Sequence, residues 1–391
     1  MKNKNNISEL FYHVNSRNSY LKVSAPMVRY SKVQFRTLVK NYNIDLTFTP
    51  MILADSFCQN TRARSNEFAT TENDSPLIVQ FASNNANDFA DASKLVYPYA
   101  DGVDLNCGCP QRWAIKDGYG CALLSKPDIV YDLIRVVKNT SPSDFSISVK
   151  IRILDDLKKT ISFCQQLENC GVTFLTVHGR TPAQKNCEDI NIYGLKTVCE
   201  SVRVPVVANG GIKTLEDADK LYDITNCNGV MVASGILTNP AMFTGARTTP
   251  VGCVKLWMDI KNMYKDKITF QCYHHHLVFM LEKVLSRHQK QVFNHLTTFE
   301  SVDEYLNTNL LHVQDLDVPS KFNISEFIEC EYENEIILKH LSKCRHCGKS
   351  VYYCVCNKYD YESNCGSFFK EFVENVDHLD YMNSQLFEEI I

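Results

Sequence analysis

Residues able to bind a ligand or move a proton stand at the end of one short apolar run after another. Gln80, Lys150 and His178 supply an amide, an amine and an imidazole. The stretch NCGCP at 106–110 adds an amide and two thiols, and NGG at 209–211 adds an amide and a glycine turn. If the runs are parallel strands of a barrel, these residues share the end of the barrel that carries the chemistry in barrel enzymes.

Each of these residues also has an ordinary structural explanation. Lys150 alone would be a solvated charge at a strand end, His178 a structural hydrogen-bonding group, and the NGG stretch a turn. The set is unusual because every member falls at the same end of its run. We therefore interpret it as one binding site at the mouth of a barrel.

The combination suits a flavin. The Gln80 amide can pair with the pyrimidine edge of the flavin ring, and His178 can add a second donor there. A cation at Lys150 can stabilise the charge of the reduced ring near N1 and O2. Glycine turns after the last two runs would bring backbone N–H groups close to a phosphate. The small residues Ala25 and Pro26 leave room for a flat ring across the barrel mouth.

The elements that must position these residues are eight short β-branched runs separated by helical patterns. Several runs are almost wholly apolar, which is typical of strands buried on both faces of a parallel sheet. Eight alternations predict an α/β fold, a closed (β/α)8 TIM barrel, with an open doubly wound sheet as the alternative. That alternative lacks a G-x-G-x-x-G after its first strand. The predicted strands are 23–25, 46–51, 77–81, 102–106, 147–151, 174–178, 205–209 and 229–233.

The pattern changes twice after the barrel. Residues 1–248 carry the strands, residues 249–314 form a small all-helical domain, and residues 315–391 form an irregular, acidic, cysteine-containing tail. From residue 326 onward there are 13 acidic and 6 basic residues, a net charge of −7 within a chain of −4. The rest of the chain is therefore close to +3, which neither supports nor excludes a nucleic-acid partner.

Composition indicates a protein that buries a sizeable core. Hydrophobic residues make up 45% of the 391 residues and charged residues 22%. No apolar run is long enough to span a membrane, and the first 20 residues lack the apolar core of a signal peptide. The 17 cysteines are therefore expected to be reduced thiols. We expect a cytoplasmic monomer, with the nucleus as an alternative location.

Several segments in this order resemble the tRNA-dihydrouridine synthases. They are APM, DLNCGCP, VKIR, TVHGR and ANGGI, and the resemblance runs from about residue 23 to residue 240 and on into the helical region. The most specific stretch is NCGCPQRWAIKDGYGCALL. Together with VQFA and FTPMILADSF it is most similar to the eukaryotic subfamily that acts at positions 20a and 20b of the tRNA D-loop.

The resemblance implies FMN-dependent reduction of the uracil C5–C6 bond, with NADPH or NADH as the reductant and tRNA as the partner. Hydride would pass from flavin N5 to C6, and a proton from Cys109 to C5. Cys107 is the alternative acid, although it lies on the strand side of the intervening glycine. Asn106 would lie beside the reactive part of the flavin. The implied FMN contacts are Pro26, Met27, Val28, Gln80, Lys150, His178, Asn209, Gly210, Gly211, Ala233 and Ser234.

Two positions depart from the family pattern. Relatives often carry arginine after the eighth strand, where it would pair with the FMN phosphate, but this chain has Ser234. We therefore expect weaker FMN retention. Gly211 replaces an acid that is common in the subfamily, although other members of the family have glycine there. Ser234 also raises the alternative of a non-catalytic RNA-binding relative, and a flavin barrel acting on a small pyrimidine is a further alternative.

Basic residues in four segments are candidates for contact with RNA phosphates. Their alternative is an ordinary solvated surface. Lys283, Arg287 and Lys290 are expected to form a stripe along one face of one amphipathic helix. The candidates are Arg62, Arg64, Arg112, Lys116, Arg180, Lys283, Arg287 and Lys290.

Four of the cysteines in the tail would suit a small zinc site by their number. The second pair is separated by a single residue, which is tighter than the usual spacing. We expect no metal and keep zinc as the alternative for Cys344, Cys347, Cys354 and Cys356. The acidity of the tail argues against phosphate contact and favours either a protein partner or a segment without fixed structure.

Overall fold

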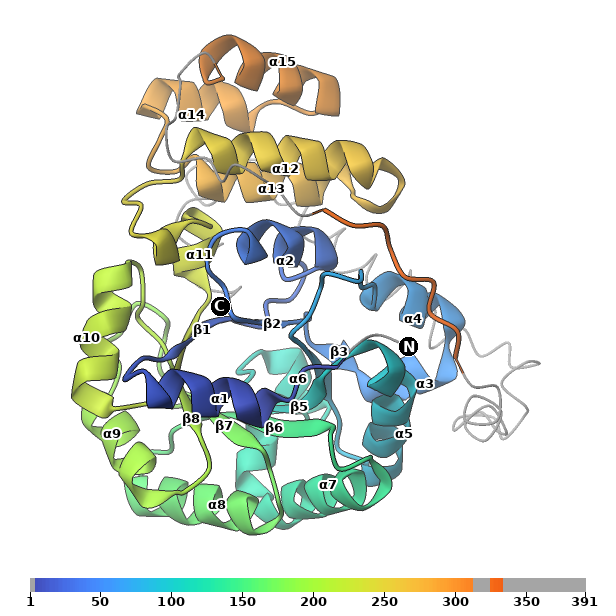
Figure 1. Ribbon diagram of the computed structural model, residues 1–391, viewed down its shortest axis with the longest axis vertical. Coiled ribbons are helices and arrows are strands. Elements are labelled where there is room, and N and C mark those ends of the chain that lie inside the picture. The colour runs from blue at the N-terminus through green and yellow to red at the C-terminus, as the bar shows by residue number, and fades with distance from the viewer. Residues whose placement is uncertain (1–3, 312–323, 333–391) are drawn as a thin grey trace.

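The structure of the protein is a computed structural model that describes residues 4–311 and 324–332. Its centre is a closed parallel barrel in which β1 pairs with both β2 and β9, and β2 also pairs with β4 (Figure 1). The strands are β1 (Leu21–Ser24), β2 (Leu46–Phe48), β3 (Ile52–Leu53), β4 (Leu77–Ala82), β5 (Gly102–Cys107), β6 (Ser146–Arg152), β7 (Phe174–His178), β8 (Val206–Asn209) and β9 (Gly229–Val232). The predicted TIM barrel is confirmed.

The second predicted strand, 46–51, is interrupted. Phe48 and Ile52 are four positions apart, but their partners Ile78 and Phe81 on β4 are only three apart, so the chain carries one extra residue there. Pro50 lies in the interruption and has no N–H to donate. The Thr49 hydroxyl instead accepts the N–H of Gln80 at 3.0 Å. The irregularity therefore helps to hold a residue of the predicted site.

Helices surround the barrel as the alternating pattern predicts. They are α2 (Val33–Lys40), α3 (Ala54–Gln59), α4 (Thr61–Glu67), α5 (Ala86–Val96), α7 (Pro127–Thr140), α8 (Leu157–Asn169), α9 (Ile192–Ser201), α10 (Leu215–Thr225) and α11 (Ser234–Thr238). The helix before the first strand, α1 (Ile7–Ser16), buries Ile7 and Phe11 four residues apart on one face. The Phe11 ring lies 5.2 Å from that of Phe174, the first residue of β7, so α1 covers the amino-terminal end of the barrel.

The chain after the barrel is helical, and Figure 1 shows this helical region stacked over α2 and α11. Its helices are α12 (Val251–Met263), α13 (Phe270–Met280), α14 (Arg287–Asn294) and α15 (Phe299–Asn309). His276 of α13 stacks on Phe35 of α2 with ring centroids 4.6 Å apart. Gln34 of α2 donates to the carbonyl of Lys267 at 2.7 Å, so the region is fixed directly to the barrel. No helix in the described ranges combines the length and apolar character that crossing a membrane requires.

The predicted basic stripe on one helix is wrong. Helix α13 ends at Met280, and Ser286 caps a new helix through a reciprocal pair of hydrogen bonds with Gln289. Lys283 therefore lies in the turn between two helices. Lys290 pairs with Glu282 at 2.8 Å. The spacing of the basic residues in the sequence suits one continuous helix and does not show that a capping box starts a new helix at Ser286.

A buried ion pair fixes α2 to the loop that follows α4. Arg36 donates through Nε and Nη2 to the carboxylate of Asp74, with the shortest distance 2.6 Å. The same guanidinium donates to the carbonyls of Ser31 and Ala69. Both side chains are almost completely shielded from solvent. The pair therefore supports the helix on which the helical region rests.

Replacing Asp74 by alanine leaves the Arg36 cation buried without its counter-charge. We expect the free energy of unfolding to fall by about 3–5 kcal/mol, as measured by urea denaturation. Lys220→Ala is the control, because its pair with Glu216 is exposed and should contribute little. Similar effects from the two substitutions would contradict this role for the Arg36–Asp74 pair.

Candidate active site

The register of the sheet brings the predicted site residues side by side. Asn106 on β5 is opposite Lys150 on β6. His178 on β7 is opposite Arg152 on β6 and Asn209 on β8. All five lie at or next to the carboxyl ends of their strands. The structure therefore gathers these residues at one end of the barrel, as the sequence predicts for all of them except Arg152.

A chain of hydrogen bonds runs across this end of the barrel. Gln80 donates its amide N–H to Asp104 at 2.8 Å and accepts the Asn106 side-chain N–H at 2.8 Å. The Asn106 side-chain oxygen then accepts the backbone N–H groups of Gly108 and Cys109, at 3.1 and 2.9 Å. An ionised carboxylate only accepts, so Asp104 fixes which way the two amides point. We call Asp104, Gln80 and Asn106 the amide relay.

Asp104 is completely buried in the middle of β5. Burial raises the pKa of its carboxyl to about 6. Hydrogen bonds from Ser148 and Gln80 act in the opposite direction and lower this pKa, but burial has the larger effect. Ser148 donates its hydroxyl at 2.6 Å. At neutral pH the carboxylate is ionised, and it has two donors in place of water.

The loop that carries Cys109 is held from two further directions. The N–H of Cys121 donates to the Cys109 carbonyl at 3.0 Å. Gly120 has φ +58°, and a side chain there would lie 2.5 Å from the same carbonyl. Arg152 is buried and donates through Nε to the Gly108 carbonyl at 3.1 Å. The thiol therefore sits on a constrained loop.

The two candidate acids differ in accessibility. Cys107 is the last residue of β5 and is fully buried, whereas Cys109 is partly exposed. Burial raises the pKa of the Cys109 thiol, and the nearby cations Arg152 and Lys150 oppose that shift. Cys109 is thus a protonated thiol within reach of a substrate, beside positive charges that would stabilise its thiolate.

Lys150 and His178 lie on the neighbouring strands β6 and β7. Burial, followed by the neighbouring charge of Arg152, lowers the pKa of Lys150 to about 8. Burial also keeps the pKa of His178 well below its ordinary value, so its imidazole is neutral. His178 Nε2 lies 3.3 Å from Nη1 of Arg180. The neutral ring can accept there and donate from its other nitrogen.

The glycine turn and the small residues lie where the sequence predicts, after β8 and β9. Gly210 and Gly211 have φ +120° and +75°, which other residues rarely adopt. Asn209 donates to the Met231 carbonyl at 2.8 Å and so links these two strands. Ala233 and Ser234 follow β9 directly, and Ser234 is partly exposed.

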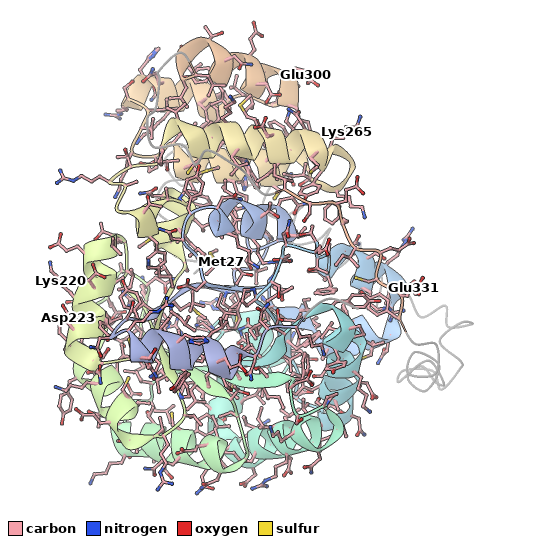
Figure 2. The ribbon with its side chains drawn as sticks, in the orientation of Figure 1. Met27, Lys220, Asp223, Lys265, Glu300 and Glu331 are labelled. Carbon is pink, nitrogen blue, oxygen red and sulfur yellow. The ribbon has the colours of Figure 1, made fainter. Side chains whose placement is uncertain are left out.

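The loop after β1 carries three predicted contacts. Ser31 accepts the N–H of Met27 at 2.9 Å, which turns the chain between β1 and α2 (Figure 2). Met27 is buried, Pro26 is partly exposed and Val28 is exposed. These residues therefore line the transition from the barrel core to its rim.

Two of the predicted RNA contacts are wrong. Arg64 is 1% exposed and donates to the carbonyls of Phe57 and Cys58, because α4 packs its guanidinium inward. Arg180 is 6% exposed and donates to the Glu188 carbonyl at 2.6 Å, besides meeting His178. Both side chains are structural in this fold.

Five of the other six basic candidates are exposed at the surface. Arg112 and Lys116 lie one turn apart on α6 (Arg112–Lys116), directly after the Cys109 loop. Lys290 is only partly exposed and is paired, as described above. The exposed candidates are Arg62, Arg112, Lys116, Lys283 and Arg287. The four tail cysteines lie outside the described residues, and no metal-binding cluster occurs within those residues.

Three residues of the site were not singled out from the sequence. Asp104 could have been found as a carboxylate inside an otherwise apolar strand, where it needs donors. Arg152 gave a weaker signal as a charge at a strand end. Gly120 gave none, because its role depends on a contact with the Cys109 loop.

Asp104→Asn should change how stability depends on pH. Its carboxyl has a raised pKa in the folded protein, so the folded state holds the proton more tightly between about pH 4 and 6. Stability is therefore lost as pH rises through this window, by about 3 kcal/mol from this group. Urea denaturation of both proteins from pH 4 to 7 should show the variant gaining relative to the wild type. A difference that stays constant with pH would contradict the assignment.

Comparisons with known proteins agree with this geometry. The family model described as dihydrouridine synthase (Dus) matches residues 23–318. A Mus musculus protein named as a tRNA-dihydrouridine(20a/20b) synthase-like protein is 49% identical over 287 residues, covering 73% of this chain and 88% of that protein. A Schizosaccharomyces pombe tRNA-dihydrouridine(20a/20b) synthase is 38% identical over 300 residues, covering 77% and 91%. The chain therefore belongs to the dihydrouridine synthase family.

Proposed function

We propose that this protein reduces uridine 20a or 20b in the D-loop of tRNA, using bound FMN and a nicotinamide coenzyme. The observation that carries the proposal is the amide relay, which holds the Cys109 thiol at the barrel mouth beside Lys150. The names of the relatives supply the substrate, and NAD(P)+ is the coenzyme in those names.

The residues at the mouth fit a flavin. Lys150 has no hydrogen bond or ion pair with any residue that the structure describes, although burial lowers its pKa. A cation that is not engaged in a direct ion pair suits the negative edge of a reduced flavin. Gln80 and His178 would bind the same edge, and Asn106 would lie beside the reactive part of the ring. The turn at Gly210 and Gly211, with Ala233 and Ser234, would hold the phosphate, and Pro26, Met27, Val28 and Asn209 would border the ring.

When bound, reduced flavin supplies hydride to C6 of uracil, and the coenzyme restores its electrons. The protein must then deliver a proton to C5. Cys109 can do this because burial keeps its thiol protonated at neutral pH. The thiolate that remains is stabilised by Arg152 and Lys150, and its partial exposure lets it recover a proton from solvent.

The uridine must leave its stack to reach this site. The exposed cations Arg62, Arg112 and Lys116 flank the mouth on α4 and α6, where they would contact phosphates. Lys283 and Arg287 would do the same from the helical region. We assign residues 1–248 to the FMN-binding barrel and 249–314 to tRNA binding, with the remaining tail left without a catalytic role.

The proposal is tested by incubating the protein with FMN, NADPH and a tRNA transcript, and locating dihydrouridine by position. Product at 20a or 20b is the expected result. Product on free uridine but none on tRNA would instead indicate a small-molecule reductase. A flavin-loaded protein that modifies neither substrate would overturn the proposal.

Cys109→Ala should remove the proton transfer to C5 of uracil and leave the binding and reduction of the flavin unchanged. We expect dihydrouridine formation to fall about 10²–10⁴-fold, which is the usual contribution of a general acid. Flavin content and the rate of flavin reduction by NADPH should stay unchanged. Cys121→Ala is the matched control, because it removes a neighbouring thiol and should retain activity. Full activity in the Cys109 variant would move the role to Cys107 or away from thiols altogether.

Ser234→Arg should strengthen the binding of FMN. Arginine would add a charge-assisted bond to the phosphate, so we expect the dissociation constant to fall about tenfold in a fluorescence titration. Asn139→Arg adds the same charge on the outer face of α7 and should have no effect. Equal effects from both would indicate general electrostatics, and no effect from either would contradict the placement of the phosphate.

A further inference from the structure

A described segment beyond the residues that match the family crosses from the helical region to the barrel. We call residues 324–332 the strap; Figure 1 shows it in orange, descending from the helical region past α4. It follows α15 in the sequence and pairs with Thr71 through a single antiparallel bridge at Phe327. The strap therefore lies beyond the residues that the family model matches.

One end of the strap holds the turn between α12 and α13. The Phe327 ring packs on Tyr264 with centroids 4.4 Å apart, and the Tyr264 hydroxyl donates to the Ser325 carbonyl. Lys267 lies with Nζ 4.7 Å from the centroid of the Phe327 ring. This turn is also held on its other side by the bond from Gln34 of α2. Phe327 thus adds contacts to a part of the helical region that α2 also holds.

The other end of the strap is anchored on the barrel. Ile328 donates its N–H to the Thr70 carbonyl at 2.9 Å, and the Tyr99 hydroxyl donates to the Glu331 carbonyl at 2.6 Å. The Tyr332 ring lies 5.2 Å from the guanidinium carbon of Arg64. It also lies 6.0 Å from the ring of Phe57 on α3. The burial of Arg64 described above is thus shared between α4 and the strap.

The outer face of the strap is unsuited to RNA. Glu326, Glu329 and Glu331 are exposed, whereas the residues between them pack inward. Figure 2 shows Glu331 at the outer edge beside α3 and α4. Three carboxylates would repel a phosphate backbone. The strap therefore acts through its packing and not as a surface that contacts tRNA.

We propose that the strap holds the helical region at the angle that tRNA binding requires, with Phe327 as its principal positioning residue. The inference rests on the proposed function, because it concerns how that substrate is held. In this proposal the flavin is reduced by NADPH at the barrel mouth, and that step is expected to be independent of the strap. Loss of Phe327 should therefore weaken the reaction with tRNA and leave the reaction with the coenzyme intact.

The test uses the full chain with Phe327→Ala, the conservative Phe327→Leu, and Glu329→Gln on the exposed face as the matched control. For Phe327→Ala we expect KM for tRNA to rise about tenfold, which corresponds to ~1.4 kcal/mol of binding free energy. The turnover number, the flavin content and the rate of anaerobic flavin reduction by NADPH should stay close to those of the wild type. Phe327→Leu should restore most of the affinity, and Glu329→Gln should match the wild type.

Hydrogen exchange supplies a readout that needs no tRNA activity. In Phe327→Ala, exchange should rise at the end of α12 and in the following turn, residues 263–268, but not in the barrel strands. An unchanged KM and unchanged exchange would overturn the inference, as would a parallel loss of flavin and coenzyme reactivity. If the wild type itself forms no dihydrouridine, the proposed function fails. The exchange pattern and direct tRNA binding by each variant then still decide the role of the strap.

Discussion

The side chain of Asn106 joins the strands of the barrel to the loop that carries Cys109. Its amide nitrogen is fixed to Gln80 within the barrel, and its oxygen holds the backbone of the Cys109 loop. Because Gln80 is itself fixed by Asp104 and by the hydroxyl of Thr49, the position of the thiol derives from β4, β5 and the segment between β2 and β3. A loop residue thereby gains the positional precision of a sheet, which general acid catalysis requires.

The electrostatics of the site follow from the same arrangement. One buried carboxylate lies below the mouth, and the cations Lys150 and Arg152 lie above and beside it. Burial raises the pKa of the Cys109 thiol and lowers that of the Lys150 amine, so the thiol holds its proton while the amine nears the range in which it can lose one. The site can therefore hold a proton ready for release next to charges that favour the anion left behind.

Much of this architecture could be predicted from the sequence, because burial and chemistry both leave local patterns. The eight apolar runs and the residues at their ends predicted the barrel and the grouping of Gln80, Asn106, Lys150 and His178. One of the failures depended on contacts between distant segments, and the other on a local helix cap. Arg64 looks like an exposed loop cation, but a carbonyl of α3 and the ring of Tyr332 enclose it. The basic stripe failed because a Ser286 capping box interrupts an apparently continuous helical pattern.

The most direct test of the account is a double-mutant cycle on the reaction of reduced protein with tRNA. Asn106→Ala, Cys109→Ala and the double variant are each reduced anaerobically, mixed with tRNA, and followed by the reoxidation of the flavin. If Asn106 acts by holding Cys109, the double variant should be no slower than Cys109→Ala alone, because residues that act as a unit are not additive. Effects that multiply in the double variant would contradict the account and assign Asn106 a role independent of the thiol.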